Sequence, residues 1–302
     1  MLLDEIVNYS DAQYRLYGEK CGNRECTRPA GHCSGSCYNC LYNIHYPDRA
    51  PEGSKKLYDC PKMLFHYVCQ YSYLYTKELL CAFEEEYDFL KGYSQYNILS
   101  LGCGGCADLM ALEYFGVYHR KMPTYYIGID INKLWIPVHQ QVKRYCNFAG
   151  IDFDEPIYED AFKFVQEYSI EDINVIVISY LISYLYNSNQ IDQINSFINN
   201  ITENIIKRKG DNKLLLIIND VNSNRRGRNY FADFEECIRG KGLTVLNSKY
   251  KYFDTGHLNV YQMLGTPYEM EGLGVDIPET IQREYHARTE MQTTIQLLLE
   301  VV

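Results

Sequence analysis

Short apolar runs alternate with stretches of helical spacing through the middle of the chain. The runs predict strands at 97–101, 125–130, 155–158, 173–179 and 213–219. The helical stretches lie near 106–117, 134–148, 160–168 and 189–208. Each apolar run is short and rich in β-branched or aromatic residues, which is typical of strands buried on both faces. The alternation predicts a doubly wound α/β fold with a mostly parallel sheet.

Two further extended stretches follow a predicted helix at 230–240. They cover 243–252 and 257–264 and are joined by Phe253-Asp254-Thr255-Gly256, a turn short enough for a hairpin. We therefore expect a seven-stranded sheet that ends in an antiparallel hairpin. After Gly265 the pattern is weak, and we expect a final helix from Glu279 to Val302.

The first third of the chain has a different character. Residues 21–59 show little periodicity and are rich in Gly, Pro, Ser, Asn and Cys, so they need a source of order other than an apolar core. Pro61 suits the first turn of a long or broken helix over 61–91, in which Glu84-Glu85-Glu86 predicts a solvated face. We expect a cysteine-rich module at 1–60, a main domain at 61–264 and an extension at 265–302.

The N-terminal cysteines have the spacing of metal ligands. Cys37-x2-Cys40 is a short pair of the kind that holds zinc, and Cys33 and Cys60 are our choice for the other two ligands. Substitutes for these are Cys21, Cys26, His32, His45, His66 and Cys69. Cys33-x3-Cys37-x2-Cys40 also has the spacing by which one class of enzymes holds a four-iron cluster. Asn39, however, stands where the enzymes of that class usually carry an aromatic residue. Free buried thiols are the third interpretation, and we expect Cys103 and Cys106 to be packing residues or part of a turn.

Charge and hydropathy limit the environment and the partners. The 302 residues carry a formal net charge of −10, which argues against indiscriminate wrapping of nucleic acid. No apolar run approaches the roughly 18 residues that span a bilayer, and Met1-Leu2-Leu3-Asp4-Glu5 carries acid where a signal peptide carries base. We expect a cytoplasmic protein that has no membrane partner.

A glycine turn follows the first predicted strand, in Leu101-Gly102-Cys103-Gly104-Gly105. A strand, a Gly-x-Gly turn and a helix let the backbone approach a ligand closely, because glycine has no Cβ and tolerates positive φ. The turn alone also satisfies the dinucleotide fingerprint G-x-G-x-x-A, so a dehydrogenase competes at this point.

Two carboxylates after the next strands favour one family. Asp130 ends the second strand, where it suits ribose hydroxyls, and Asp160 ends the third. With the glycine turn, the Gly-Ile-Asp strand end and the Glu-Asp-Ala turn, residues 95–264 resemble the class I S-adenosylmethionine-dependent methyltransferases. The resemblance implies cofactor contacts from Leu101, Gly102, Cys103, Gly104, Gly105, Asp108, Asp130, Ile131, Asp160, Ala161 and Ser179. Ser100 replaces an acid that the family often has, and Asp108 or a backbone carbonyl is expected to take over its contact.

Residues after the fourth and fifth strands are expected to face the acceptor. Tyr180 would stack on or orient it and Asp220 would act as a general base, with packing and helix capping as the respective alternatives. Arg225-Arg226-Gly227-Arg228 suits an anionic acceptor, with a solvated loop as the more common alternative for such a cluster. RNA is the first expectation and a protein or small molecule the second. A non-catalytic binding protein is the third, because of Ser100.

Overall fold

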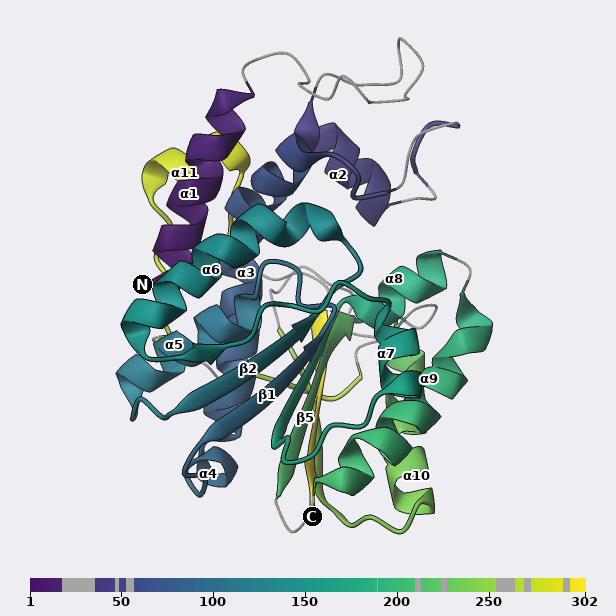
Figure 1. The fold of residues 1–302 in the computed structure, drawn as a ribbon. Helices are drawn as coiled ribbons and strands as arrows, with labels where there is room; N and C mark the ends of the chain where they lie inside the picture. The colour runs from purple at the N-terminus through teal and green to yellow at the C-terminus, as the bar shows by residue number, and fades with distance from the viewer. Residues whose placement is uncertain are drawn as a thin grey trace.

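A central sheet organises the chain in the computed structural model (Figure 1). The structure describes residues 1–17, 36–46, 49–52, 57–188, 190–209, 213–223, 227–253, 264–268, 273–289 and 294–302. The sheet has eight strands in the order β3-β2-β1-β4-β5-β8-β6-β7. Their bounds are β1 Tyr96–Leu101, β2 Thr124–Ile129, β3 Asp152–Phe153, β4 Val175–Ser179, β5 Leu214–Val221, β6 Val245–Tyr252, β7 Thr266–Pro267 and β8 Thr294–Val301. The mixed α/β, mostly parallel architecture is confirmed, with eight strands rather than seven.

The antiparallel end of the sheet differs from the prediction. Strands β1 to β5 pair in parallel, whereas β8 pairs antiparallel with both β5 and β6. The described pairings of β6 are antiparallel with β8 and parallel with β7, and the second arm of the predicted hairpin, 257–264, lies outside the described residues except for Leu264. The predicted helix Glu279–Val302 is wrong beyond Tyr285, where α11 ends, because 294–301 form β8. Along 294–301, the polar Thr294, Gln296 and Glu300 alternate with the apolar Ile295, Leu297, Leu299 and Val301, which is the period of a strand rather than of a helix.

Helices cover both faces of the sheet, as a doubly wound fold requires (Figure 1). One face carries α1 Leu2–Leu16, α3 Pro61–Glu85, α5 Ala107–Tyr118, α6 Ile136–Ala149 and α11 Glu279–Tyr285. The other carries α7 Ala161–Glu167, α8 Leu181–Asn187, α9 Ile191–Asn204 and α10 Phe231–Gly240. The short helices α2 Cys37–His45 and α4 Tyr87–Leu90 flank α3. In the described part of the chain, no helix combines the length and the apolar character needed to cross a membrane.

Helix α3 is the longest element and ends as a broken helix. Pro61 occupies its first turn, as predicted, and Cys60 is its N-cap. The chain breaks at Glu86 before α4. The solvated face predicted for the glutamate run is wrong for Glu86, which is 1% exposed and lies 3.0 Å from the Lys249 ammonium. Helix α3 instead packs its length against α1, α5 and the sheet, so acids on it reach the interior.

Candidate functional site

A cavity of about 400 Å³ lies at the carboxyl ends of the parallel strands. Its walls come from the loops after β1, β2 and β4, from the start of α7, and from the segment that leads into α3. The lining residues are Leu57, Tyr58, Asp59, Tyr67, Gly102, Gly104, Asp130, Ile131, Asn132, Trp135, Asp160, Ala161, Phe162, Ser179, Tyr180, Leu181, Tyr184, Leu185 and Gln190. This volume and this position at the strand ends are usual for ligand sites in open α/β sheets.

The glycine turn forms part of the floor of this cavity. Gly102 and Gly104 have φ of +73° and +48°, in the left-handed region that glycine tolerates without strain. The N–H groups of Gly102 and Cys103 both donate to the Ile129 carbonyl, at 2.8 and 3.0 Å, which fixes the turn to the end of β2. The backbone is thus presented to a ligand without a side chain in the way.

Asp130 is fastened beside the turn. Its Oδ2 accepts the N–H of Gly104 at 2.9 Å and its Oδ1 accepts the N–H of Asn132 at 2.8 Å. Burial raises the pKa of Asp130, and these two hydrogen bonds oppose the rise. Each carboxylate oxygen has a second lone pair, so the group is oriented and still able to accept two hydroxyl donors.

Asp160 lines the same cavity from the start of α7. Its Oδ1 accepts the N–H groups of Phe162 at 2.7 Å and Lys163 at 3.4 Å, so the residue is an N-cap. The strand predicted at 155–158 is wrong, since β3 is Asp152–Phe153 and only Ile157 bridges to β2, at Ile129. That single bridge nevertheless brings Asp160 to the edge where Asp130 lies.

Some of the residues expected to touch the cofactor line the cavity and others do not. Leu101, Cys103, Gly105 and Asp108 are not among the lining residues, whereas Ile131, Ala161 and Ser179 are. The carboxylate of Asp108 is turned into the core, where its Oδ1 accepts a hydrogen bond from the Tyr126 hydroxyl at 2.9 Å. Burial raises the pKa of Asp108 to about 6. Its position does not support the expected contact with the cofactor, because it faces the sheet rather than the cavity.

Tyr180 is held at the cavity wall by a buried network that the sequence did not reveal. Its hydroxyl donates to the Glu78 carboxylate at 2.8 Å and lies 2.8 Å from Thr294 Oγ1. The amide of Asn219 donates to Glu78 Oε2 at 2.7 Å. Burial raises the pKa of Glu78 to about 7. Glu78 comes from α3, and its only sequence signal is an acid that stands apart from the glutamate run at the end of that helix.

Asp220 is placed differently from Tyr180. It is fully buried and is not among the lining residues. Its Oδ2 accepts the N–H of Ser183 at 3.0 Å and its Oδ1 accepts its neighbour Val221 N–H at 2.7 Å. A Cβ added to Gly227 would lie 2.6 Å from the Asp220 carboxyl carbon, so the loop after β5 packs directly on this group. The geometry favours a structural role that ties α8 to the end of β5.

The predicted zinc ligands are only partly described. Cys33 lies outside the described residues. The same holds for Arg225 and Arg226 of the arginine cluster after β5. Cys37, Cys40 and Cys60 come together in one small apolar cluster with Leu41 and Met63. Whether they bind an ion stays a prediction.

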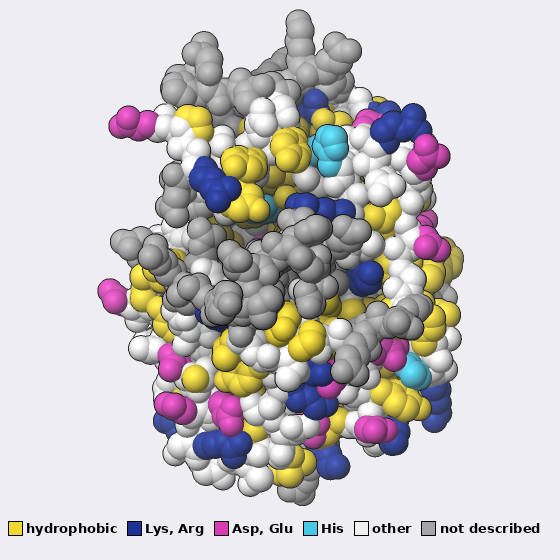
Figure 2. Space-filling view, turned by 180° about the vertical axis from the view of Figure 1, so that it is seen from behind, with side chains coloured by type: hydrophobic (Ala, Val, Ile, Leu, Met, Phe, Trp, Pro, Cys, Tyr) yellow, Lys and Arg dark blue, Asp and Glu magenta, His cyan; other side chains and the backbone are white. Residues whose placement is uncertain are grey.

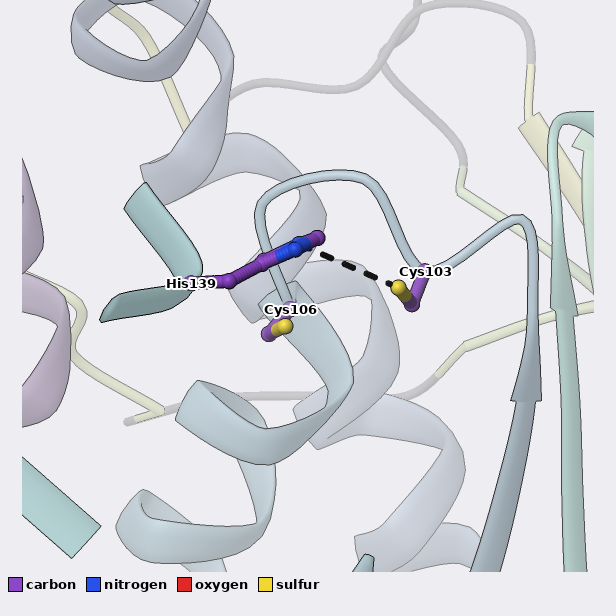
Figure 3. A group of neighbouring side chains, drawn as sticks. All are labelled: Cys103, Cys106 and His139. Carbon is purple, nitrogen blue, oxygen red and sulfur yellow. Dashed lines mark hydrogen bonds between the residues drawn. The ribbon is translucent and has the colours of Figure 1, made fainter. Parts of the chain in front are cut away.

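Another group of metal-ligand types lies directly behind the glycine turn (Figure 3). One ligand atom from each of Cys103, Cys106 and His139 lies within 4.8 Å of the others, and all three side chains are buried. The Cys103 sulfur is 3.9 Å from His139 Nε2. The hydrogen bond from Cys103 and the nearby His139 lower the pKa of the Cys106 thiol. The sequence did not reveal this group, because His139 comes from α6 and no local spacing links it to the turn.

Comparison with known proteins gives structural likeness without close relatives. No family model and no curated protein matches the chain. A class I S-adenosylmethionine-dependent methyltransferase from Listeria monocytogenes is 11% identical, with 99% of this chain and 87% of that chain covered and a TM-score of 0.47. The plantazolicin methyltransferase BpumL, solved with SAH, is 12% identical, with 99% of each chain covered and a TM-score of 0.41. The methyltransferase yhhF from Escherichia coli is 10% identical, with 72% and 85% covered and a TM-score of 0.36.

These likenesses are too slight to carry an argument about activity. The class of the protein is defined by its own geometry: a Rossmann-like, doubly wound α/β fold with a ligand-sized cavity at the strand ends. Which ligand the cavity takes follows from the side chains that line it.

Proposed function

We propose that the protein is an S-adenosylmethionine-dependent methyltransferase. The observation that carries the proposal is the convergence on one cavity of two successive strand ends and of the segment that bridges to the second of them. Gly102 and Gly104 follow β1, Asp130 follows β2, and Asp160 follows the bridge at Ile157. The backbone of the turn suits close approach to the cofactor, Asp130 suits its ribose, and Asp160 suits its adenine.

The charge of the lining supports this cofactor over a dinucleotide. Asp59, Asp130 and Asp160 line the cavity, and no lysine or arginine does so among the described residues. S-adenosylmethionine carries a sulfonium and an ammonium against a single carboxylate and is therefore a net cation, whereas a dinucleotide carries an anionic pyrophosphate. Like charges at close range in a partly buried site repel and opposite charges attract, so three carboxylates favour the cation.

The chemistry requires alignment more than an activated nucleophile in the protein. The bound cofactor supplies a methyl group on a positively charged sulfur, which the acceptor displaces in line. Tyr180 lines the cavity, and its hydroxyl is anchored to Glu78 and Thr294, so its ring is a fixed wall against which an acceptor can be oriented. We assign no proton transfer to Asp220, since both its oxygens accept backbone N–H groups away from the cavity.

RNA is the first candidate acceptor. Tyr58, Tyr67, Trp135 and Tyr184 line the cavity and offer aromatic faces on which a base can stack. The phosphates of an RNA would stay outside, because the lining is acidic. Figure 2 shows Lys and Arg side chains interspersed with Asp and Glu on the described part of the face that it displays.

An amine of a protein or a small molecule is the second candidate. The three carboxylates that line the cavity favour an uncharged or cationic acceptor over an anionic one. The N-terminal module, with zinc at Cys33, Cys37, Cys40 and Cys60, is part of the proposal as a scaffold for the acceptor. The clustering of Cys37, Cys40 and Cys60 supports it.

Calorimetry with S-adenosylmethionine, S-adenosylhomocysteine and NAD tests the cofactor. We expect the first two to bind and NAD not to bind. Asp130→Ala should abolish binding of both, while Asp154→Ala, an acid outside the lining residues, should leave it unchanged. Binding of NAD alone would overturn the proposal.

Transfer of a labelled methyl group to fractionated RNA, protein and metabolites then distinguishes the two acceptors. Label in the RNA fraction supports the first candidate, and label in protein or metabolites supports the second. Cofactor binding without transfer to any fraction would indicate a binding protein and overturn the assignment as an enzyme.

A further inference from the structure

The thiols of the glycine turn and the imidazole of α6 converge in the core. Cys103 lies in the turn, Cys106 is the N-cap of α5, and His139 comes from the first half of α6. Their exposed fractions are 7%, 0% and 2%. Figure 3 shows the three side chains pointing toward one another behind the turn, with the contact between Cys103 and His139 dashed.

Cys106 is packed in the core but has a strained backbone. Its φ is +61°, in the left-handed region, which costs a residue with a Cβ about 1 kcal/mol or more. Its side chain makes no capping hydrogen bond to α5. Glycine would adopt this backbone without strain, and the cysteine found here instead places its sulfur beside Cys103 and His139.

We propose that Cys103, Cys106 and His139 bind a zinc ion. Two thiolates and one imidazole are the ligand types that zinc prefers. With ordinary zinc–ligand bond lengths, a tetrahedral site separates sulfur and nitrogen by about 3.6 Å. The Cys103 sulfur and His139 Nε2 are already 3.9 Å apart, so binding requires only small movements.

The surroundings of the imidazole suit such a site. His139 Nδ1 lies 2.8 Å from the Tyr158 hydroxyl, and a metal-binding histidine commonly uses its second nitrogen in this way. Nε2 donates to the Gly104 carbonyl at 2.7 Å. When the ion binds, the ring proton moves to Nδ1 and is donated to Tyr158, the two thiol protons pass to solvent, and the Gly104 carbonyl loses its donor.

A buried carboxylate lies on the same helix as Cys106. Asp108 is 3% exposed, and its Oδ2 has no hydrogen-bond partner within the described residues. An unpaired carboxylate oxygen in an apolar core is costly unless a cation is near. A dication bound at Cys103, Cys106 and His139 would offset that cost.

The metal content of the full-length protein, purified anaerobically without added metal, tests this site. We expect His139→Asn to lower the zinc-to-protein ratio by one equivalent and His139→Cys to restore it, because thiolate is also a zinc ligand. Cys81→Ala is the matched control, since Cys81 is a buried cysteine on α3, and it should not change the ratio. An unchanged ratio in His139→Asn would overturn the site.

A second measurement separates this site from the N-terminal cysteines. In a Cys37→Ser, Cys40→Ser, Cys60→Ser background, cobalt added in place of zinc should give sulfur-to-cobalt charge-transfer absorption, and adding Cys103→Ser should remove it. If that triple variant does not fold, Cys103→Ser is introduced into the otherwise wild-type protein. The charge-transfer absorption should then be weaker than in the wild type. Absorption unaffected by Cys103→Ser, or a Cys103–Cys106 disulfide in the anaerobic protein, would contradict the proposal. None of these readouts depends on methyl transfer.

Discussion

The Tyr180 hydroxyl donates a hydrogen bond to the Glu78 carboxylate at 2.8 Å, which joins the end of β4 to the middle of α3. Gln296 extends the network from β8, since its side-chain amide donates to the Glu78 carbonyl at 2.8 Å and to Asn219 Oδ1 at 3.1 Å. Helix α3 lies outside the parallel βα units, yet it supplies the acid to which Tyr180, a residue of the cavity wall, is anchored. Substitutions in this network are therefore expected to change the stability of the fold at the cavity wall.

Removal of the Tyr180 hydroxyl should destabilise the protein. In Tyr180→Phe the ring remains, but the buried Glu78 loses one of its donors, which should lower the free energy of unfolding by about 1–3 kcal/mol. Chemical denaturation at pH 8 measures this. Tyr184→Phe is the control, because Tyr184 also lines the cavity and its hydroxyl makes no hydrogen bond within the described chain. Equal effects in the two variants would contradict the role of Glu78.

Glu78 should also make stability depend on pH. Burial raises its pKa from 4.5 to about 7, so between these values the folded protein holds a proton that the unfolded chain has released. Stability therefore falls as the pH rises through this window, by an amount on the order of 3 kcal/mol. In Glu78→Gln this part of the fall should disappear.

Comparing the wild type with Glu78→Gln isolates the contribution of Glu78 to the pH dependence of stability. Asp108 and Glu86, whose pKa values burial raises to about 6 and about 8, contribute falls of the same sign in both. Denaturation curves at pH 5 and pH 8 give the difference. If the loss of stability between these two pH values is the same in Glu78→Gln as in the wild type, Glu78 does not titrate in this window.

The strands at the centre of the sheet could be predicted because local pattern and burial agree there. Strands β1, β2, β4 and β5 are short apolar runs buried on both faces, and each falls within or next to its predicted range. Strand β8 differs from the predicted helix although polar and apolar residues alternate along most of it, a period of two that favours a strand. Its pairing with β5 and β6 decides the outcome, and that pairing is not local.

The distinction between local sequence pattern and non-local packing applies to the site as well. Gly104, Asp130 and Asp160 could be placed together from sequence, since parallel strands bring their carboxyl ends to one edge. Glu78 and His139 could not, because each belongs to a helix whose packing on the sheet brings it to the site. Cys106 was taken for a turn or packing residue because nothing in the sequence shows its left-handed backbone or the imidazole beside its sulfur.

Substitutions at Asp160 should separate cofactor affinity from stability. Asp160→Asn keeps an N-cap for α7 but removes the charge, so we expect about tenfold weaker binding of S-adenosylmethionine with little change in stability. Asp160→Ala removes both and should also lower the free energy of unfolding by about 1 kcal/mol. Calorimetry and denaturation of the two variants measure these effects. Undiminished affinity in both would place the adenine elsewhere.

Two left-handed glycines allow the ligand contact of the turn to be tested apart from backbone strain. Gly104 and Gly150 have φ of +48° and +69°, so alanine at either position should destabilise the fold by about 1 kcal/mol or more. A Cβ on Gly104 would lie 3.7 Å from the Trp135 ring, whereas one on Gly150 would meet nothing within 4 Å.

Both Gly104 and Trp135 line the cavity, so only Gly104→Ala should also weaken binding of S-adenosylmethionine. Gly150 ends α6 and is not among the lining residues, so Gly150→Ala should keep wild-type affinity at temperatures where it is folded. The informative quantity is the dissociation constant of Gly104→Ala divided by that of Gly150→Ala. Any effect of the backbone strain that alanine causes in both variants cancels in this ratio. A ratio near one would mean that the turn does not contact the cofactor, and would remove the central support for methyl transfer.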